Sequence, residues 1–193
     1  MRIGSLDPTK FDERQKQLHD RIAGRRGHVR GPYLAWLHQP ELCDKVEGLN
    51  SYLRWDSSLP GRISELSILV TARFWDAAYP WAAHAEKAVD AGVPQEAVDA
   101  LARGEIPSFE AEDEAVFYRF TMELLRDHFV SDDTYSEARR VFGEAGVVDL
   151  VGAIGAFSML AMVLNTFEVD LHSGRPEPFP DVRGFRRSAA RAR

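Results

Sequence analysis

The stretch Arg62-Ile-Ser-Glu-Leu-Ser-Ile-Leu-Val-Thr-Ala-Arg-Phe-Trp-Asp-Ala-Ala-Tyr-Pro-Trp-Ala-Ala-His84 contains a carboxylate, Glu65, and an imidazole, His84, nineteen residues apart. On one straight helix these two side chains would lie about 28 Å apart and could not interact. Proline is disfavoured inside a helix but tolerated in its first turn, so the segment around Asp76 and Pro80 predicts a break. The stretch therefore predicts two antiparallel helices, 62–75 and 80–91, that bring Glu65 and His84 together.

The rest of the sequence also carries helix signals, and no segment alternates cleanly enough to predict a strand. The predicted fold class is all-α, a single-domain helical bundle. We expect an N-terminal helical arm over 1–29, the main domain over 30–170, and an extended arm rich in proline and arginine over 171–193. The last of these follows from the run Arg175-Pro-Glu-Pro-Phe-Pro180, which is not compatible with a helix.

A long apolar segment, Leu150 to Phe167, has about the length that a membrane-spanning helix needs. Its glycines and alanines suit close helix packing equally well, and acidic residues flank it without a positively charged edge. We therefore predict a buried helix over 147–167 and no membrane association. Because a helix that is apolar all round needs neighbours on every side, this segment also suggests that the chain forms an oligomer.

Composition limits the function further. The formal charge of -6 and the pI near 5.5 argue against a general nucleic-acid binder, although the segment from Arg183 to Arg193 is locally basic and reads as a frayed or partner-docking arm. The single cysteine, Cys43, excludes an internal disulfide and a cysteine metal cluster. No secretory signal is recognisable, so we expect a cytoplasmic protein.

Motifs for bound cofactors are missing from the sequence. The glycines between Gly24 and Gly31 follow no strand and lack the lysine and serine of a phosphate loop. The other histidines that we considered do not have metal-ligand spacing, and each is more typical of a surface or core histidine: His28, His38, His128 and His172. We expect neither a metal nor a cofactor.

Four separated blocks match a known pattern in order and spacing: Gly31-Pro-Tyr-Leu-Ala-Trp-Leu-His-Gln-Pro-Glu-Leu42, Tyr52-Leu-Arg54, Leu59-Pro-Gly-Arg-Ile-Ser-Glu-Leu66, and Ala72-Arg-Phe-Trp75 with Tyr79-Pro-Trp-Ala-Ala-His84. Over residues 30–170 the chain resembles the carboxymuconolactone decarboxylase superfamily, which includes the alkylhydroperoxidase D-like (AhpD-like) proteins. The resemblance implies an all-α fold whose protomers associate as trimers or hexamers.

The resemblance also implies a departure in chemistry. The peroxidase members carry a Cys-x-x-Cys pair before the histidine and a glutamate twelve residues before the first cysteine. On this sequence the histidine falls on His84 and the glutamate on Glu65, but the cysteines fall on Ala77 and Pro80. Peroxidase activity needs an attacking thiolate and a resolving thiol, and Cys43 lies elsewhere without a partner, so we reject that activity.

The decarboxylase-like branch also lacks the cysteines, although many members have an acid where this chain has Pro80. This resemblance suggests a cofactor-independent lyase that acts on a carboxylated lactone or unsaturated metabolite. We predict that His84 donates a proton and that Glu65 fixes its tautomer or raises its pKa. We predict that Arg73 binds a substrate carboxylate through two hydrogen bonds and that Tyr79 supplies a further hydrogen bond. Trp75 and Trp81 are predicted to form an apolar wall beside the substrate.

Each assignment has a structural alternative. Glu65 and His84 suit a satisfied buried pair, Arg73 suits a structural ion pair, and the tryptophans suit the core. The alternative function is a catalytically silent oligomer of the same fold that binds a small molecule or a protein. An enzyme should show a pocket of about 300 to 1,000 Å³ beside His84, Tyr79 and Arg73.

Overall fold

The computed structural model describes residues 1–171 and 177–179, and all the regular elements in these ranges are helical. The predicted all-α class is confirmed. The prediction of an extended arm over 171–193 falls mainly on residues outside the described ranges. The α-helices are α1 Glu13–Arg26, α2 Pro32–Trp36, α3 Pro40–Ser51, α4 Gly61–Phe74, α5 Ala78–Asp90, α6 Gln95–Arg103, α7 Glu112–Asp127 and α8 Asp132–Thr166.

Two shorter elements complete the chain: a 3-10 helix, Pro8–Lys10, before α1 and a π-helical turn, Tyr52–Asp56, that continues α3. Local chemistry explains the start of α1, because Asp12 accepts a hydrogen bond from the Gln15 backbone N–H at 2.7 Å and the Gln15 side chain bonds back to the Asp12 backbone N–H. Such a capping box satisfies two of the backbone N–H groups that a helix start leaves unpaired.

The predicted helix pair is present as α4 and α5. The chain reverses through Trp75, Asp76 and Ala77, and Asp76 takes a left-handed backbone conformation with φ +48°. Backbone hydrogen bonds from Asp76 N to Arg73 O at 3.1 Å and from Ala77 N to Ala72 O at 2.7 Å close this turn. Helix α5 begins two residues before the predicted position, so Pro80 lies in its first turn, where a missing N–H has no helical cost.

Helix α8 is longer than the buried helix predicted over 147–167. It is one long element with a kink at Gly143, whose φ of +71° and ψ of 172° are not helical. Only glycine adopts such a conformation readily. Gly146 is instead buried, and a Cβ placed on it would lie 2.8 Å from the Cβ of Phe142.

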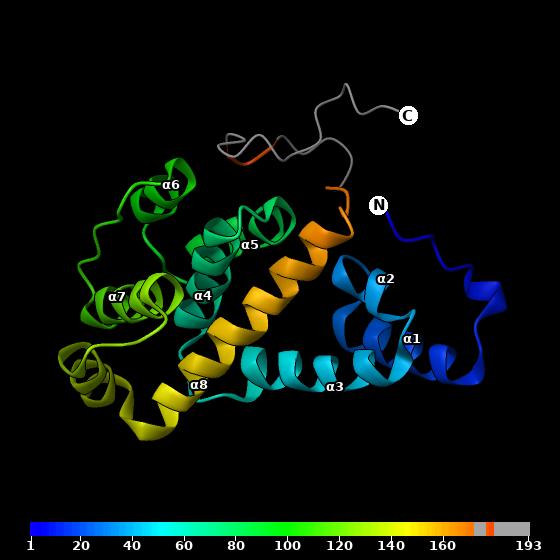
Figure 1. Cartoon of the computed structure of the whole chain (residues 1–193), viewed down its shortest axis with the longest axis horizontal. Coiled ribbons are helices and arrows are strands. Elements are labelled where there is room, and N and C mark those ends of the chain that lie inside the picture. The colour runs from blue at the N-terminus through cyan, green and yellow to red at the C-terminus, as the bar shows by residue number, and fades with distance from the viewer. Residues whose placement is uncertain (172–176, 180–193) are drawn as a thin grey trace.

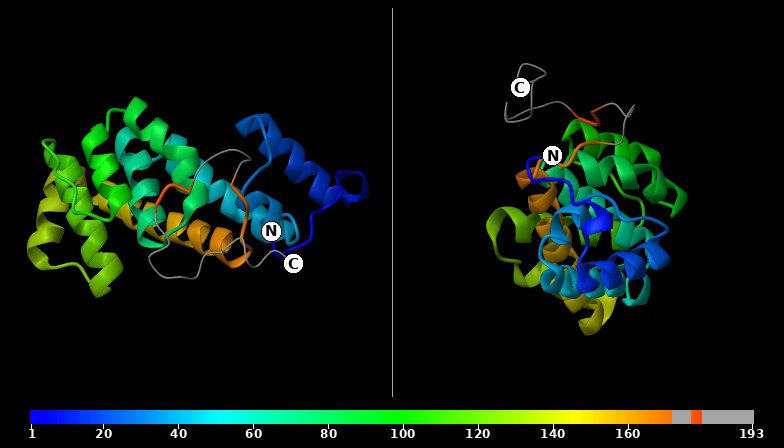
Figure 2. Two further views of the ribbon diagram at one scale, coloured as in Figure 1. Left: turned by 90° about the horizontal axis from the view of Figure 1, so that it is seen from above. Right: turned by 90° about the vertical axis from the view of Figure 1, so that its right-hand side faces the viewer.

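Among the described residues, α8 is long and apolar enough to span a membrane by length and composition. However, 56% of its most apolar window is buried within the protein. It lies diagonally between two groups of helices, α1–α3 on one side and α4–α7 on the other (Figures 1 and 2). This placement matches the predicted buried central helix.

Two apolar clusters fill the molecule. The larger is built around α4, whose side chains are buried along most of its length, and it includes residues of α5, α6, α7 and α8. The smaller joins Leu18 and Ile22 of α1 to Tyr33 and Trp36 of α2, with Met159 of α8 packed against it. The predicted N-terminal arm therefore packs through α1 onto the same protein body, and α8 contributes to both clusters.

Gly31 positions the loop between α1 and α2 against α5. Its φ is +63°, and a Cβ at this position would lie 2.7 Å from Cε1 of Tyr79. The loop can approach α5 this closely only because residue 31 has no side chain.

We predict that Gly31→Ala lowers the free energy of unfolding by about 1–3 kcal/mol, through backbone strain and the clash with Tyr79. Gly24→Ala is the matched control, because Gly24 lies within α1 and has open space beside it. It should raise stability by about 0.4–1 kcal/mol. Urea unfolding measures both, and equal effects would contradict the close approach.

Candidate active site

Glu65 and His84 meet across the α4–α5 pair. Nδ1 of His84 lies 2.6 Å from Oε2 of Glu65, and each side chain is 14% exposed. The predicted pairing is therefore present in the fold. Because a half-buried ionised carboxylate can only accept, the short contact assigns the proton to Nδ1 and leaves Nε2 with a free lone pair.

Arg54 is the third member of the cluster and was not among the predicted site residues. Its Nη2 donates to Oε1 of Glu65 at 3.1 Å, so the carboxylate is bound on both oxygens. Arg54 belongs to the π-helical turn, whose i→i+5 bond from Ser57 N to Tyr52 O is 2.8 Å long. The block Tyr52-Leu-Arg54 was the sequence signal that could have pointed to Arg54. No spacing rule predicts a contact between residues 54 and 65, because the loop Leu59-Pro-Gly61 separates them.

The electrostatic environment favours an ionised Glu65 and a neutral His84. Burial alone would raise the pKa of the Glu65 carboxyl, but the hydrogen bond with His84 and the positive charges of Arg54 and Lys87 outweigh burial and lower it. Burial lowers the pKa of His84 below its usual 6.5, although Glu65 opposes this change, while Arg54 and Lys87 add to it. The resting imidazole is thus suited to accept a proton at Nε2 before it donates one.

Arg73, predicted to clamp a substrate carboxylate, already has three contacts. Its Nη1 forms an ion pair with Asp76, its Nε donates to the Leu101 carbonyl at 3.1 Å, and its guanidinium lies 5.0 Å from the ring centroid of Phe179. These contacts match the structural alternative for Arg73. They join the end of α4 to the α4–α5 turn and to α6, and none of them involves Glu65 or His84.

Tyr79 lies in the first turn of α5 against Gly31. Burial raises the pKa of its hydroxyl, while the charge of Arg30 acts in the opposite direction. The hydroxyl is therefore protonated at neutral pH and can donate a hydrogen bond. Arg30 brings a positive charge to this end of α5.

The three tryptophans considered at this site differ in their surroundings. Trp81 and Trp36 are buried in the larger and the smaller cluster respectively. Trp75 is half-buried in the α4–α5 turn, and its backbone carbonyl accepts from Nδ2 of Asn165 at 2.7 Å. Trp36 and Trp81 thus belong to the core, while the predicted wall role of Trp75 and Trp81 stays a prediction.

A second buried ion pair lies beside the first and was not predicted. Arg26 Nη2 is 2.9 Å from Oε2 of Glu47. The Glu47 carboxylate also accepts hydrogen bonds from the hydroxyls of Tyr33 and Ser51. The Trp55 ring connects the two networks, because the guanidinium carbons of Arg26 and Arg54 lie 4.9 and 5.3 Å from its centroid.

Neither of two cavities lined by described residues includes His84, so the expected pocket beside His84, Tyr79 and Arg73 stays a prediction. One of about 500 Å³ lies beside α7, with Phe109, Tyr118 and Arg119 in its lining, and one of about 170 Å³ lies under the N-terminal segment near Phe11 and Leu34. Within residues 1–171 and 177–179, no three histidine, cysteine, aspartate or glutamate side chains gather in a way that could hold a metal ion.

Cys43 does not resemble a reactive thiol. It is fully buried, and burial together with the charge of Glu47 raises the pKa of its thiol to about 11. A thiol of this kind is not ionised at neutral pH, and the thiolate is the nucleophilic form. Ala77 and Pro80, where the peroxidases of the resembled superfamily carry cysteines, are both buried.

Comparison with solved structures identifies the fold. A peroxidase-related protein from Ralstonia eutropha, described as an alkylhydroperoxidase AhpD core, superposes with a TM-score of 0.74 at 14% identity, covering 89% of this chain and 92% of its own. The chain has the AhpD-like fold. No protein-family model and no curated protein matches the sequence.

Two further structures share the AhpD-like fold. A protein of unknown function from Agrobacterium tumefaciens, described as a putative antioxidant defence protein AhpD, matches with a TM-score of 0.62 at 18% identity over 72% of this chain and 95% of its own. The debrominase Bmp8, solved in complex with 2,3,4-tribromopyrrole, matches with a TM-score of 0.71 at 13% identity over 90% of this chain and 92% of its own. The superfamily resemblance is thus confirmed at the level of the fold.

The lowered pKa of His84 predicts a pH dependence of stability. On unfolding, the histidine regains a pKa near 6.5 and takes up a proton, so unfolding becomes more favourable as the pH falls below about 6.5. Between about pH 7.5 and 5.5, above the range where glutamates titrate, the melting temperature of the wild type should therefore fall more steeply than that of His84→Gln.

The matched control is His128→Gln, because His128 is exposed. This variant should keep the wild-type pH dependence in the same thermal unfolding series. Parallel curves for wild type and His84→Gln would show that burial does not hold His84 neutral.

Proposed function

We propose that the protein is a cofactor-independent acid–base enzyme of the decarboxylase-like kind, acting on a carboxylated lactone or unsaturated small metabolite. The observation that carries the proposal is the 2.6 Å contact between His84 and Glu65, with Arg54 on the second carboxylate oxygen. A neutral imidazole oriented by an ionised carboxylate is a suitable proton shuttle.

The residues support a balanced sequence of steps. The substrate binds as a carboxylate, Nε2 of His84 takes up a proton from solvent, and Glu65 stabilises the resulting imidazolium. The bond to the carboxyl carbon then breaks, CO₂ leaves, and the electron pair passes into the conjugated carbonyl of the substrate. The imidazolium transfers its proton to the carbanionic carbon, which restores the neutral histidine. His84 thus becomes the predicted donor only after it has acted as a base.

Substrate binding needs positive charge near the pair. Arg73 would have to exchange its Asp76 partner to bind a carboxylate. Lys87 acts electrostatically on both Glu65 and His84, and Arg30 acts on Tyr79. We therefore add Lys87 and Arg30 to Arg73 as candidate carboxylate-binding residues, with the Tyr79 hydroxyl as a hydrogen-bond donor.

A thiol peroxidase reaction is not part of the proposal. Ala77 and Pro80 cannot attack a peroxide, and the Cys43 thiol is buried with its pKa raised to about 11. The acid–base chemistry proposed here uses groups that are present in the chain.

A thermal-shift screen against lactones, β-keto acids and unsaturated dicarboxylates, with 2,3,4-tribromopyrrole as a further arm, should find ligands that raise the melting temperature. For each ligand, CO₂ release is followed. His84→Ala should lower the turnover rate by about 10²–10⁴-fold, because it removes the proton shuttle.

The matched control for this test is Glu96→Gln, an exposed glutamate on α6, which should keep wild-type turnover. Glu65→Gln should lower turnover without abolishing ligand binding, because it removes the charge that stabilises the imidazolium. Binding without CO₂ release by the wild type would instead support the silent binding protein of the same fold.

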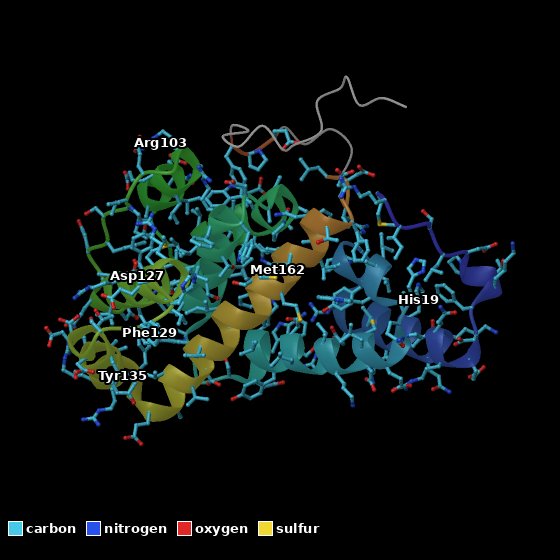
Figure 3. The ribbon with its side chains drawn as sticks, in the orientation of Figure 1. His19, Arg103, Asp127, Phe129, Tyr135 and Met162 are labelled. Atoms are coloured by element: carbon cyan, nitrogen blue, oxygen red, sulfur yellow. The ribbon has the colours of Figure 1, made fainter. Side chains whose placement is uncertain are left out.

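We further propose that the protein is a homo-oligomer, in line with the predicted trimer or hexamer. Helix α8 presents Val148, Val151 and Met162 to solvent, with exposed fractions of 72, 47 and 43%. Figure 3 labels Met162 on this helix. The Tyr52 hydroxyl bonds to Asp149 at 2.9 Å, which places the half-exposed Tyr52 ring beside this face. Apolar surface of this kind is typical of contacts between copies of a chain.

Val151→Glu should lower the molar mass measured by light scattering after gel filtration, because it places a charge in the proposed interface. Ile106→Glu is the control, since Ile106 is exposed on the loop between α6 and α7, away from α8. A monomeric wild type, or an equal effect of both substitutions, would contradict the assignment of this face.

A further inference from the structure

Two residues predicted to contact a substrate, Trp81 and Arg73, contact the Phe179 side chain of the same chain. The Phe179 ring lies edge-on to Trp81, with ring centroids 5.4 Å apart and an interplanar angle of 82°. On another side, the Arg73 guanidinium lies 5.0 Å from the Phe179 centroid. Phe179 is only 4% exposed, although it is thirteen residues beyond the last residue of α8.

The two residues that contact Phe179 are each held in place by other contacts. Trp81 is buried in α5, within the larger core cluster. Arg73 is fixed by the ion pair with Asp76 and by its hydrogen bond to the Leu101 carbonyl of α6. The contact therefore joins α4, α5 and α6 at one corner, next to the turn that precedes Tyr79 and His84 (Figure 1). A ring edge against indole and a cation near a ring face are both favourable aromatic geometries.

The sequence around Phe179 suits reversible docking. Prolines at 178 and 180 flank it, and a residue before proline is restricted to extended conformations. A segment that prolines restrict to few accessible conformations loses little entropy when it docks. Within residues 177–179, Phe179 is the one large apolar side chain.

We propose that the corner formed by Trp81 and Arg73 is a recognition site for an aromatic side chain on a proline-flanked segment, and that Phe179 of the same chain is its resident ligand. With Phe179 in place, Trp81 is covered one helical turn before His84. This proposal concerns binding and stands independently of the reaction proposed for His84.

The test is complementation in trans with full-length protein. A capped peptide with the sequence of residues 176–180, Pro-Glu-Pro-Phe-Pro, is titrated into the Phe179→Ala variant, and the Trp81 indole resonance is followed by ¹H–¹⁵N NMR, assigned with Trp81→Phe. The peptide should bind Phe179→Ala at least about tenfold more tightly than the wild type, because the tethered Phe179 competes at high effective concentration. A peptide with alanine in place of phenylalanine is the matched control and should not bind.

Three outcomes would overturn the proposal: identical Trp81 indole shifts in wild type and Phe179→Ala, equal peptide binding by both proteins, or no binding of the phenylalanine peptide to a folded Phe179→Ala protein at millimolar concentration. Phe179→Leu provides a second variant if the alanine variant does not fold, because it keeps apolar volume while removing the ring. A wild-type Trp81 shift that depends on protein concentration would overturn the assignment to the same chain.

Discussion

The hydrogen bond between His84 and Glu65 is the constraint on which the α4–α5 half of the molecule depends. A half-buried carboxylate is costly unless both its oxygens find partners, and here the imidazole binds one and Arg54 the other. This requirement defines the register of α5 against α4 and the position of the π-helical turn that carries Arg54. The same partners hold Glu65 ionised and leave Nε2 of His84 as an open acceptor, so stability and proposed chemistry share one cause.

The contacts of Glu47 form a second buried polar network beside this one. Glu47 is satisfied by Arg26, Tyr33 and Ser51 in the same way that Glu65 is satisfied by His84 and Arg54. Both arginines lie near the Trp55 ring, so the α1–α3 group and the α4–α5 pair meet through cation–π contacts as well as through apolar contact. Networks of this kind favour a single packing arrangement, because any slip would leave a buried charge without a partner.

The helix pair was predictable from the sequence because its signals are local: a proline in the first turn of a helix and a carboxylate–imidazole spacing that only a reversal can satisfy. Arg54 was not predictable, since its contact with Glu65 depends on an unusual π-helical turn and on the path of the following loop. The α8 kink at Gly143 was not predicted, because the sequence has glycines at both 143 and 146 and only packing distinguishes them. The contacts of Arg73 with Leu101 and Phe179 join distant segments, which no periodicity encodes.

The protonation state of His84 at rest is the quantity to measure first. In ¹⁵N NMR of imidazole-labelled protein at pH 7, with His84→Gln to assign the resonance, we predict a neutral ring protonated at Nδ1 and unprotonated at Nε2. That tautomer follows from an ionised Glu65 that can only accept a hydrogen bond, and from burial that lowers the pKa of His84. An imidazolium at pH 7, or a neutral ring protonated at Nε2, would contradict the proposed proton shuttle.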